Sequence, residues 1–128
     1  MKRILAGCIV LIMSLLLVHN VYAVDKDAIK KQVDEIVVAI DGGKKADDFA
    51  DAAKKDPYVF ILGANDILLV HPSLLGQNLK EKAEPIYVSV IKATPEGGWV
   101  EYVWQGKLKH TYVKKTKSNM IVGSGYSD

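Results

Sequence analysis

The stretch PEGGWVEYVWQGKLKHTYVKKTKSNMIVGSGY, residues 95–126, decides the fold of this chain. It contains three runs rich in β-branched and aromatic residues, at 99–104, 107–115 and 120–126, which are joined by short polar links. Such runs, bounded by Gly, Pro, Ser and Asn, are typical of strands. Because the links are short, consecutive strands must run antiparallel. We therefore predict a three-stranded antiparallel unit that follows a Pro-Glu-Gly-Gly turn.

A hairpin is predicted upstream of this unit. Residues 58–62 and 67–71 are short apolar runs separated by Gly-Ala-Asn-Asp, a composition typical of turns. Both runs lack alternating polar residues, so we expect these strands to be buried on both faces. The connection at 72–84 is expected to be irregular. Residues 86–93 suit either a strand or a short helix packed on the sheet, and we predict the helix.

Helical periodicity precedes the hairpin. From Asp25 onward, apolar residues recur at intervals of three, four and one, which places them on a single stripe of a helix. They are Ile29, Val33, Ile36, Val37 and Ile40. A second helical segment follows, with Ala46, Phe49, Ala50 and Ala53 on one face. Together these elements predict an α+β domain with an antiparallel sheet of about five strands.

The N-terminus predicts export. Lys2 and Arg3 precede an uncharged, largely apolar stretch, and Ala23 closes a sequence suited to signal peptidase. We expect residues 1–23 to be a signal peptide cleaved after Ala23, with a periplasmic domain at 24–128. The alternative is a membrane tether formed by the uncleaved signal, although an apolar core of about 15 residues is short for a spanning helix.

Charge and cysteine content exclude several classes of function. Without Lys2 and Arg3, the 17 basic residues become 15, which equals the 15 acidic residues. We therefore expect no nucleic-acid partner. The single cysteine, Cys8, lies in the predicted signal, so the domain would have no disulfide and no thiolate metal site.

Catalytic patterns are scarce in the predicted domain. Only His71 and His110 remain there, with no zinc-protease helix, nucleophile elbow or phosphate loop. Gly-Ser-Gly at 123–125 resembles a nucleophile site, but no helix follows, and small residues there favour close packing. We expect no enzyme, no metal and no cofactor. For His71 we favour a hydrogen-bonded structural role over a pocket role.

Aromatic residues and one lysine indicate a binding site. Tyr102 and Trp104 are two apart on a strand and share a face, while Trp99 points to the other. Lys109 stands inside a strand, where a lysine is either an exposed face residue or part of a pocket. If its ammonium turns inward, it can meet a small anion beside aromatic rings.

Five segments together resemble the single Cache domains, which are PAS-like extracellular sensor modules of bacterial chemoreceptors and histidine kinases. The segments are, in order, Pro57-Tyr-Val-Phe-Ile, Leu69-Val-His-Pro followed by Leu75-Gly-Gln-Asn-Leu, Gly98-Trp-Val-Glu-Tyr-Val-Trp, Lys109-His-Thr-Tyr-Val-Lys, and Ile121-Val-Gly-Ser-Gly-Tyr. The resemblance implies a long N-terminal helix packed on the sheet. It also implies a small ligand, commonly a short carboxylate, held between the sheet and its covering loops.

The resemblance also implies which residues bind the ligand. Trp104, Lys109 and Tyr112 are the first candidates; the others are Tyr102, Tyr58, Phe60 and His71. Lys109 and Tyr112 are three apart, so a bulge would be needed to bring both to one face. Receptors of this family continue into a membrane helix, whereas this chain stops two residues after Tyr126.

We therefore expect a freestanding periplasmic protein that binds a small organic solute and presents it to a membrane receptor or histidine kinase. The alternative is a protein interaction module of the cell envelope whose pocket is filled by its own side chains.

Overall fold

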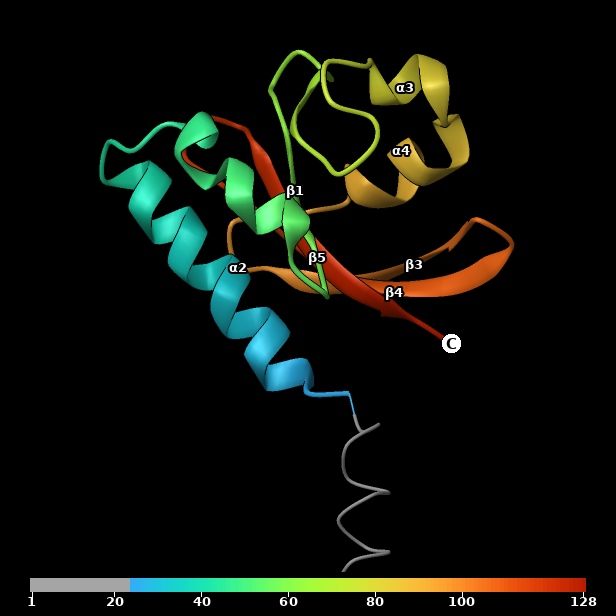
Figure 1. Cartoon of the computed structure of the whole chain (residues 1–128). Coiled ribbons are helices and arrows are strands. Elements are labelled where there is room, and N and C mark those ends of the chain that lie inside the picture. Colours follow the sequence, from blue (N-terminus) through green and yellow to red (C-terminus); the bar gives the residue numbers. More distant parts are fainter. Residues whose placement is uncertain (1–23) are drawn as a thin grey trace, which may run out of the picture.

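The computed structural model of the protein describes residues 24–128, and the predicted signal at 1–23 lies outside the described residues. The elements are α2 (Lys26–Asp41), the 3-10 helix η1 (Ala46–Lys54), β1 (Val59–Leu62), β2 (Leu68–Val70), α3 (Leu79–Lys82), α4 (Glu84–Val90), β3 (Gly98–Trp104), β4 (Lys107–Lys115) and β5 (Ile121–Ser127). Figure 1 shows them arranged around one sheet. The molecule is an α+β domain, as the sequence predicts.

The five strands form one antiparallel sheet in the order β2-β1-β5-β4-β3. The C-terminal strands pair as a meander, and the hairpin β1–β2 joins through β1 to β5. The β3–β4 register runs without interruption from Gly98↔Val113 to Trp104↔Lys107. The register of β4 with β5 is also continuous, so β4 carries no bulge that could change the face of its side chains.

Helices cover both faces of the sheet. On one face, α2 packs against β4 and β5, and the stripe predicted from the periodicity supplies the five buried residues of this helix. Asp25 caps its start by accepting a hydrogen bond from the Ala28 amide at 2.9 Å. On the other face, α4 contacts β3. Two apolar clusters result, one on each side of the sheet.

Two short helices lie between residues 72 and 93, where the sequence predicts an irregular connection followed by one helix. The ambiguous segment is helical in α4, with Pro85 in its first turn, where a proline is tolerated. The connection expected to be irregular contains the short helix α3. Asn78 caps it by accepting from the Glu81 amide at 3.1 Å. No helix within residues 24–128 is both long and apolar enough to cross a membrane.

The glycines of β5 allow close packing across the sheet, as the Gly-Ser-Gly sequence suggests. A Cβ at Gly123 would strike the Phe60 ring, and one at Gly125 would strike the backbone oxygen of His110. Between them, Ser124 is fully buried, and its hydroxyl donates to the Tyr58 carbonyl oxygen at 2.8 Å. This segment is therefore a packing element of the sheet.

Candidate functional site

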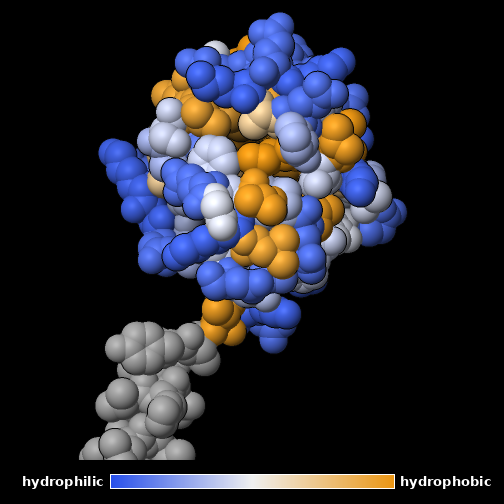
Figure 2. Space-filling view, turned by 90° about the vertical axis from the view of Figure 1, so that its right-hand side faces the viewer, coloured by the Kyte–Doolittle hydropathy of each residue, from blue (hydrophilic) through white to orange (hydrophobic). Residues whose placement is uncertain are grey.

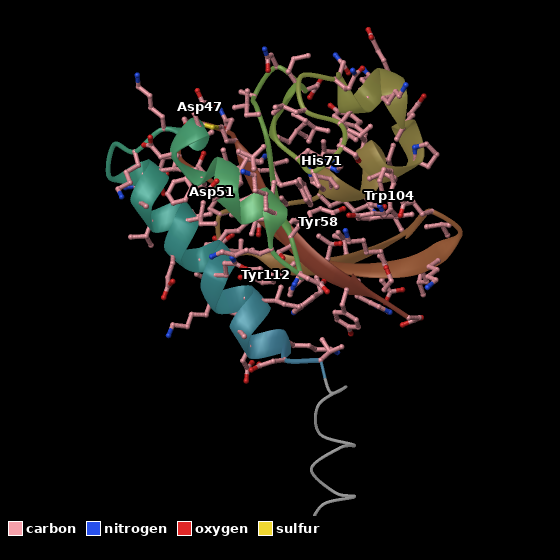
Figure 3. All side chains as sticks on the ribbon, viewed as in Figure 1. Asp47, Asp51, Tyr58, His71, Trp104 and Tyr112 are labelled. Carbon is pink, nitrogen blue, oxygen red and sulfur yellow. The ribbon has the colours of Figure 1, made fainter. Side chains whose placement is uncertain are left out.

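Six of the seven predicted site residues lie on the sheet face that α4 covers. Strand alternation places Tyr58 with Phe60 and Tyr102 with Trp104, and the continuous register of β4 adds Lys109 to the same face. His71 comes from the end of β2. Figure 3 shows Tyr58, His71 and Trp104 on this side of the sheet and Tyr112 toward α2.

Tyr112, expected beside Lys109, instead belongs to the apolar cluster under α2. Its hydroxyl donates to the Asp34 carboxylate at 3.2 Å, and Lys114 also contacts Asp34 at 3.2 Å. Desolvation raises the pKa of Asp34, but hydrogen bonds from Lys30 and Lys114 outweigh it, so that the net pKa is lowered. Tyr112 therefore joins the sheet to α2 and lies away from the other six residues.

Lys109 is the centre of the site. It is only 4% exposed, and its Nζ donates to the Tyr58 hydroxyl oxygen at 2.6 Å while lying 4.0 Å from the centre of the Tyr58 ring. No carboxylate among residues 24–128 forms an ion pair with it. Desolvation lowers the pKa of Lys109 from 10.5 to about 8. Among the described residues, this buried ammonium thus has only a phenol as its hydrogen-bonding partner.

The imidazole of His71 lies beside this ammonium and is neutral. Its Nδ1 accepts hydrogen bonds from the backbone amides of Ser73 and Leu74, at 3.0 and 2.9 Å. The proton of the neutral ring must therefore sit on Nε2. Burial, and then the charge of Lys109, lowers the pKa of His71 to about 4. The ring is thus hydrogen-bonded to the backbone, and it keeps one N–H donor that no hydrogen bond of the described residues uses.

The aromatic rings contact one another around His71. The ring centres of Tyr58 and Trp104 lie 5.5 and 6.0 Å from that of His71, both in edge-on arrangements. Burial raises the pKa values of Tyr58 and Tyr102, so that both phenols are neutral at pH 7. Thr111 donates to the Tyr102 hydroxyl at 3.0 Å. Sequence reasoning missed Thr111, although it lies two residues from Lys109 and thus on the same face.

Two hollows adjoin this cluster. The first, between the sheet and α4, has a volume of about 20 Å³, which is room for about one water molecule. It is lined by Tyr58, Phe60, Leu68, His71, Leu74, Leu79, Ile86, Val90, Tyr102 and Trp104. The space in which the resemblance places a ligand is thus nearly filled by side chains.

The second hollow is an open cleft of about 650 Å³ at the end of the sheet. Its walls come from the start of α2, residues 56–58, the β3–β4 turn, Lys109 and the end of β5. Tyr58 and Trp104 line both hollows, whereas Lys109 lines only the cleft. Sequence reasoning missed the cleft because its walls come from five separated segments.

Several polar side chains of the cluster can act only as hydrogen-bond donors. Lysine and tryptophan side chains only donate hydrogen bonds, and His71 has only its Nε2–H left to offer. Within residues 24–128, no group of three or more His, Cys, Asp or Glu side chains could hold a metal ion. The arrangement can bind an acceptor-rich or anionic group between aromatic rings.

Comparison with known proteins finds no family model that matches this chain and no curated protein significantly similar to it.

Proposed function

We propose that the protein binds a small organic anion, a short carboxylate in the first place, through the ammonium of Lys109. One observation carries this proposal: a lysine that is 4% exposed has no carboxylate partner among residues 24–128. Burying a charge is unfavourable unless the charge is paired, and buried charges in proteins are usually paired. A ligand carboxylate would supply the missing partner.

The neighbours of Lys109 support an anion. Tyr58 can donate its hydroxyl hydrogen to an acceptor while it accepts from the ammonium, and the Nε2–H of His71 is a further donor. The rings of Tyr58 and Trp104 would exclude water from a short carbon skeleton. The low pKa of His71 keeps this ring neutral, so the local positive charge at pH 7 comes from Lys109.

The volumes of the two hollows indicate how the ligand would reach the ammonium. The hollow of about 20 Å³ is too small for a carboxylate with a carbon chain, whereas the adjoining cleft is large enough for a metabolite. We infer that the ligand enters from the cleft and that its carboxylate contacts Lys109 there. A shift of the Tyr58 ring would extend the site toward His71.

The biological setting that we propose rests on the sequence. The Cache resemblance of the five segments, with its PAS-like sheet and long N-terminal helix, supports a sensory role. The predicted signal peptide supports a periplasmic location. In this setting the loaded protein would present its solute to a membrane receptor or histidine kinase, and it would catalyse no reaction.

The alternative function is a protein interaction module of the cell envelope. The nearly filled hollow between the sheet and α4 favours it, because a module of this kind needs no ligand cavity. Exposed apolar side chains on the β3–β4 hairpin also favour it: Val103 is 63% exposed and Leu108 is 38% exposed. Figure 2, which looks onto the right-hand side of Figure 1, shows hydrophobic residues gathered in the middle of this face.

A ligand screen separates the two functions. Thermal unfolding would be followed with a panel of short carboxylates, each at a saturating concentration, for the protein and for Lys109→Met. Stabilisation by one or more acids, lost in Lys109→Met and kept in Lys107→Met, supports anion binding. Lys107 is a suitable control because it is an exposed lysine of the same strand. No stabilisation by any acid would leave the interaction module as the better account.

A further inference from the structure

Lys109 and Tyr58 form a pair of groups that can transfer a proton. The Nζ of Lys109 donates to the Tyr58 hydroxyl oxygen at 2.6 Å and lies 4.0 Å from the centre of the Tyr58 ring. Lys109 is 4% exposed, and no carboxylate of residues 24–128 forms an ion pair with it. Burial without a counter-charge favours the neutral amine, and a desolvated lysine amine is a nucleophile toward carbonyl groups.

This pair borders open space. Both Lys109 and Tyr58 line the cleft of about 650 Å³, and among the described residues that line it Lys109 is the only lysine. Because Lys109 has little exposed surface and the Tyr58 ring stands beside its Nζ, a small reactant has the best access. An aldehyde meets this condition, since one substituent of its carbonyl carbon is hydrogen.

We propose that Lys109 captures a small aldehyde as a reversible imine, with the Tyr58 hydroxyl relaying the proton. This inference goes beyond the proposed anion site, because it uses the neutral amine in place of the ammonium. The Nζ lone pair attacks the carbonyl carbon, and one proton passes from Nζ through the Tyr58 hydroxyl to the carbonyl oxygen, which gives a carbinolamine. Loss of its hydroxyl group together with the remaining Nζ proton forms the C=N bond and one water molecule, with no oxidation or reduction.

Reductive trapping tests this proposal. The purified protein would be incubated with dilute acetaldehyde and cyanoborohydride, which reduces an imine to a stable ethylamine, and peptide mass spectrometry would follow each lysine. At about pH 7.5 we expect Lys109 to react about tenfold faster than Lys107, an exposed lysine of the same strand, because burial lowers the pKa of Lys109 to about 8. In urea this preference should disappear with the fold. The α-amine of a mature N-terminus at Val24 also has a pKa of about 8, so its peptide is followed separately.

A tyrosine variant tests the proton relay. Tyr58→Phe keeps the ring and removes the hydroxyl, so we expect the rate of trapping at Lys109 to fall at least about tenfold. Tyr102→Phe is the matched control, because the hydroxyl of this buried tyrosine accepts from Thr111 at 3.0 Å. It should keep the rate of the unchanged protein. Thermal unfolding of both variants verifies that each is folded during trapping.

The outcomes separate this inference from the proposed function. Trapping of Lys109 no faster than that of Lys107 in the folded protein would overturn the imine, and equal rates in Tyr58→Phe and Tyr102→Phe would overturn the relay. Selective trapping at Lys109 without stabilisation by any carboxylate would support the imine and contradict the anion site. Carboxylate binding that depends on Lys109, without selective trapping, would support the anion site and contradict the imine.

Discussion

The ammonium of Lys109 donates to the hydroxyl of Tyr58 at 2.6 Å, across 51 positions of the chain, and forms no ion pair with residues 24–128. The two residues bring β4 and the start of β1 together over β5. A polar contact of this kind stabilises the fold less than apolar packing of the same volume, because the charge has lost its water. A buried charge that costs stability in this way favours a role in binding.

The first prediction concerns the stability cost of Lys109. Lys109→Met keeps most of the side-chain volume and removes the buried charge, so we expect the free energy of unfolding at pH 7 to rise by about 1 to 3 kcal/mol. Urea denaturation measures this change, with Lys107→Met as the exposed control. A loss of stability in Lys109→Met would mean that the ammonium already has a favourable partner.

The second prediction concerns alkaline pH. The pKa of Lys109 is lowered to about 8 in the folded protein, against 10.5 ordinarily. Between these values the unfolded chain binds more protons, so the Lys109 contribution to the free energy of unfolding rises with pH. The advantage of Lys109→Met over the unchanged protein should therefore shrink from about pH 7 to about pH 9.5. A constant difference over this range would contradict the lowered pKa.

The third prediction concerns His71 in acid. Its folded pKa of about 4 lies below the ordinary 6.5, so the folded state loses stability as the pH falls from 6.5 to 4. In His71→Asn, the side-chain amide oxygen can still accept a hydrogen bond from the backbone N–H two residues further along the chain, but the amide does not titrate. Urea denaturation at about pH 7 and about pH 4.5 should show a smaller loss in His71→Asn. An equal loss in both proteins would exclude His71 as the cause.

The fourth prediction concerns close packing at β5. Gly125→Ala would place a methyl group against the His110 backbone oxygen, which cannot move without disturbing the register of β4. We expect a loss of about 2 kcal/mol or more. Gly98→Ala is the control, because a Cβ there meets nothing within 4 Å. Thermal unfolding of the two variants measures the difference, and similar values would contradict this packing.

Local patterns in the sequence predict much of this fold. The intervals of three and four along α2 identify all five of its buried residues. Strand alternation places Tyr102 and Trp104 on the face opposite Trp99, since Trp99 contacts the Tyr112 ring under α2 at 5.5 Å between centres. These predictions succeed because each depends only on the period of one element.

Features that depend on contacts between distant segments could not be predicted in this way. Strand alternation by itself places Lys109 and Tyr112 on opposite faces of the sheet. The prediction that both residues contact one ligand needed a bulge between them, and the continuous register of β4 excludes such a bulge. The bond from Lys109 to Tyr58 depends on which way the lysine turns above β5. The small volume of the hollow beneath α4 depends on how ten side chains pack together, and the periodicity of the sequence does not predict this packing.

The measurement that tests the central claim most directly is a nuclear magnetic resonance titration of the lysine Nζ groups with and without a saturating carboxylate identified by the screen. A ligand anion beside Lys109 stabilises the ammonium, so we expect the pKa of this one lysine to start near 8 and to rise on ligand addition. A Lys109 pKa that stays unchanged while the ligand saturates the protein would contradict anion binding at this residue.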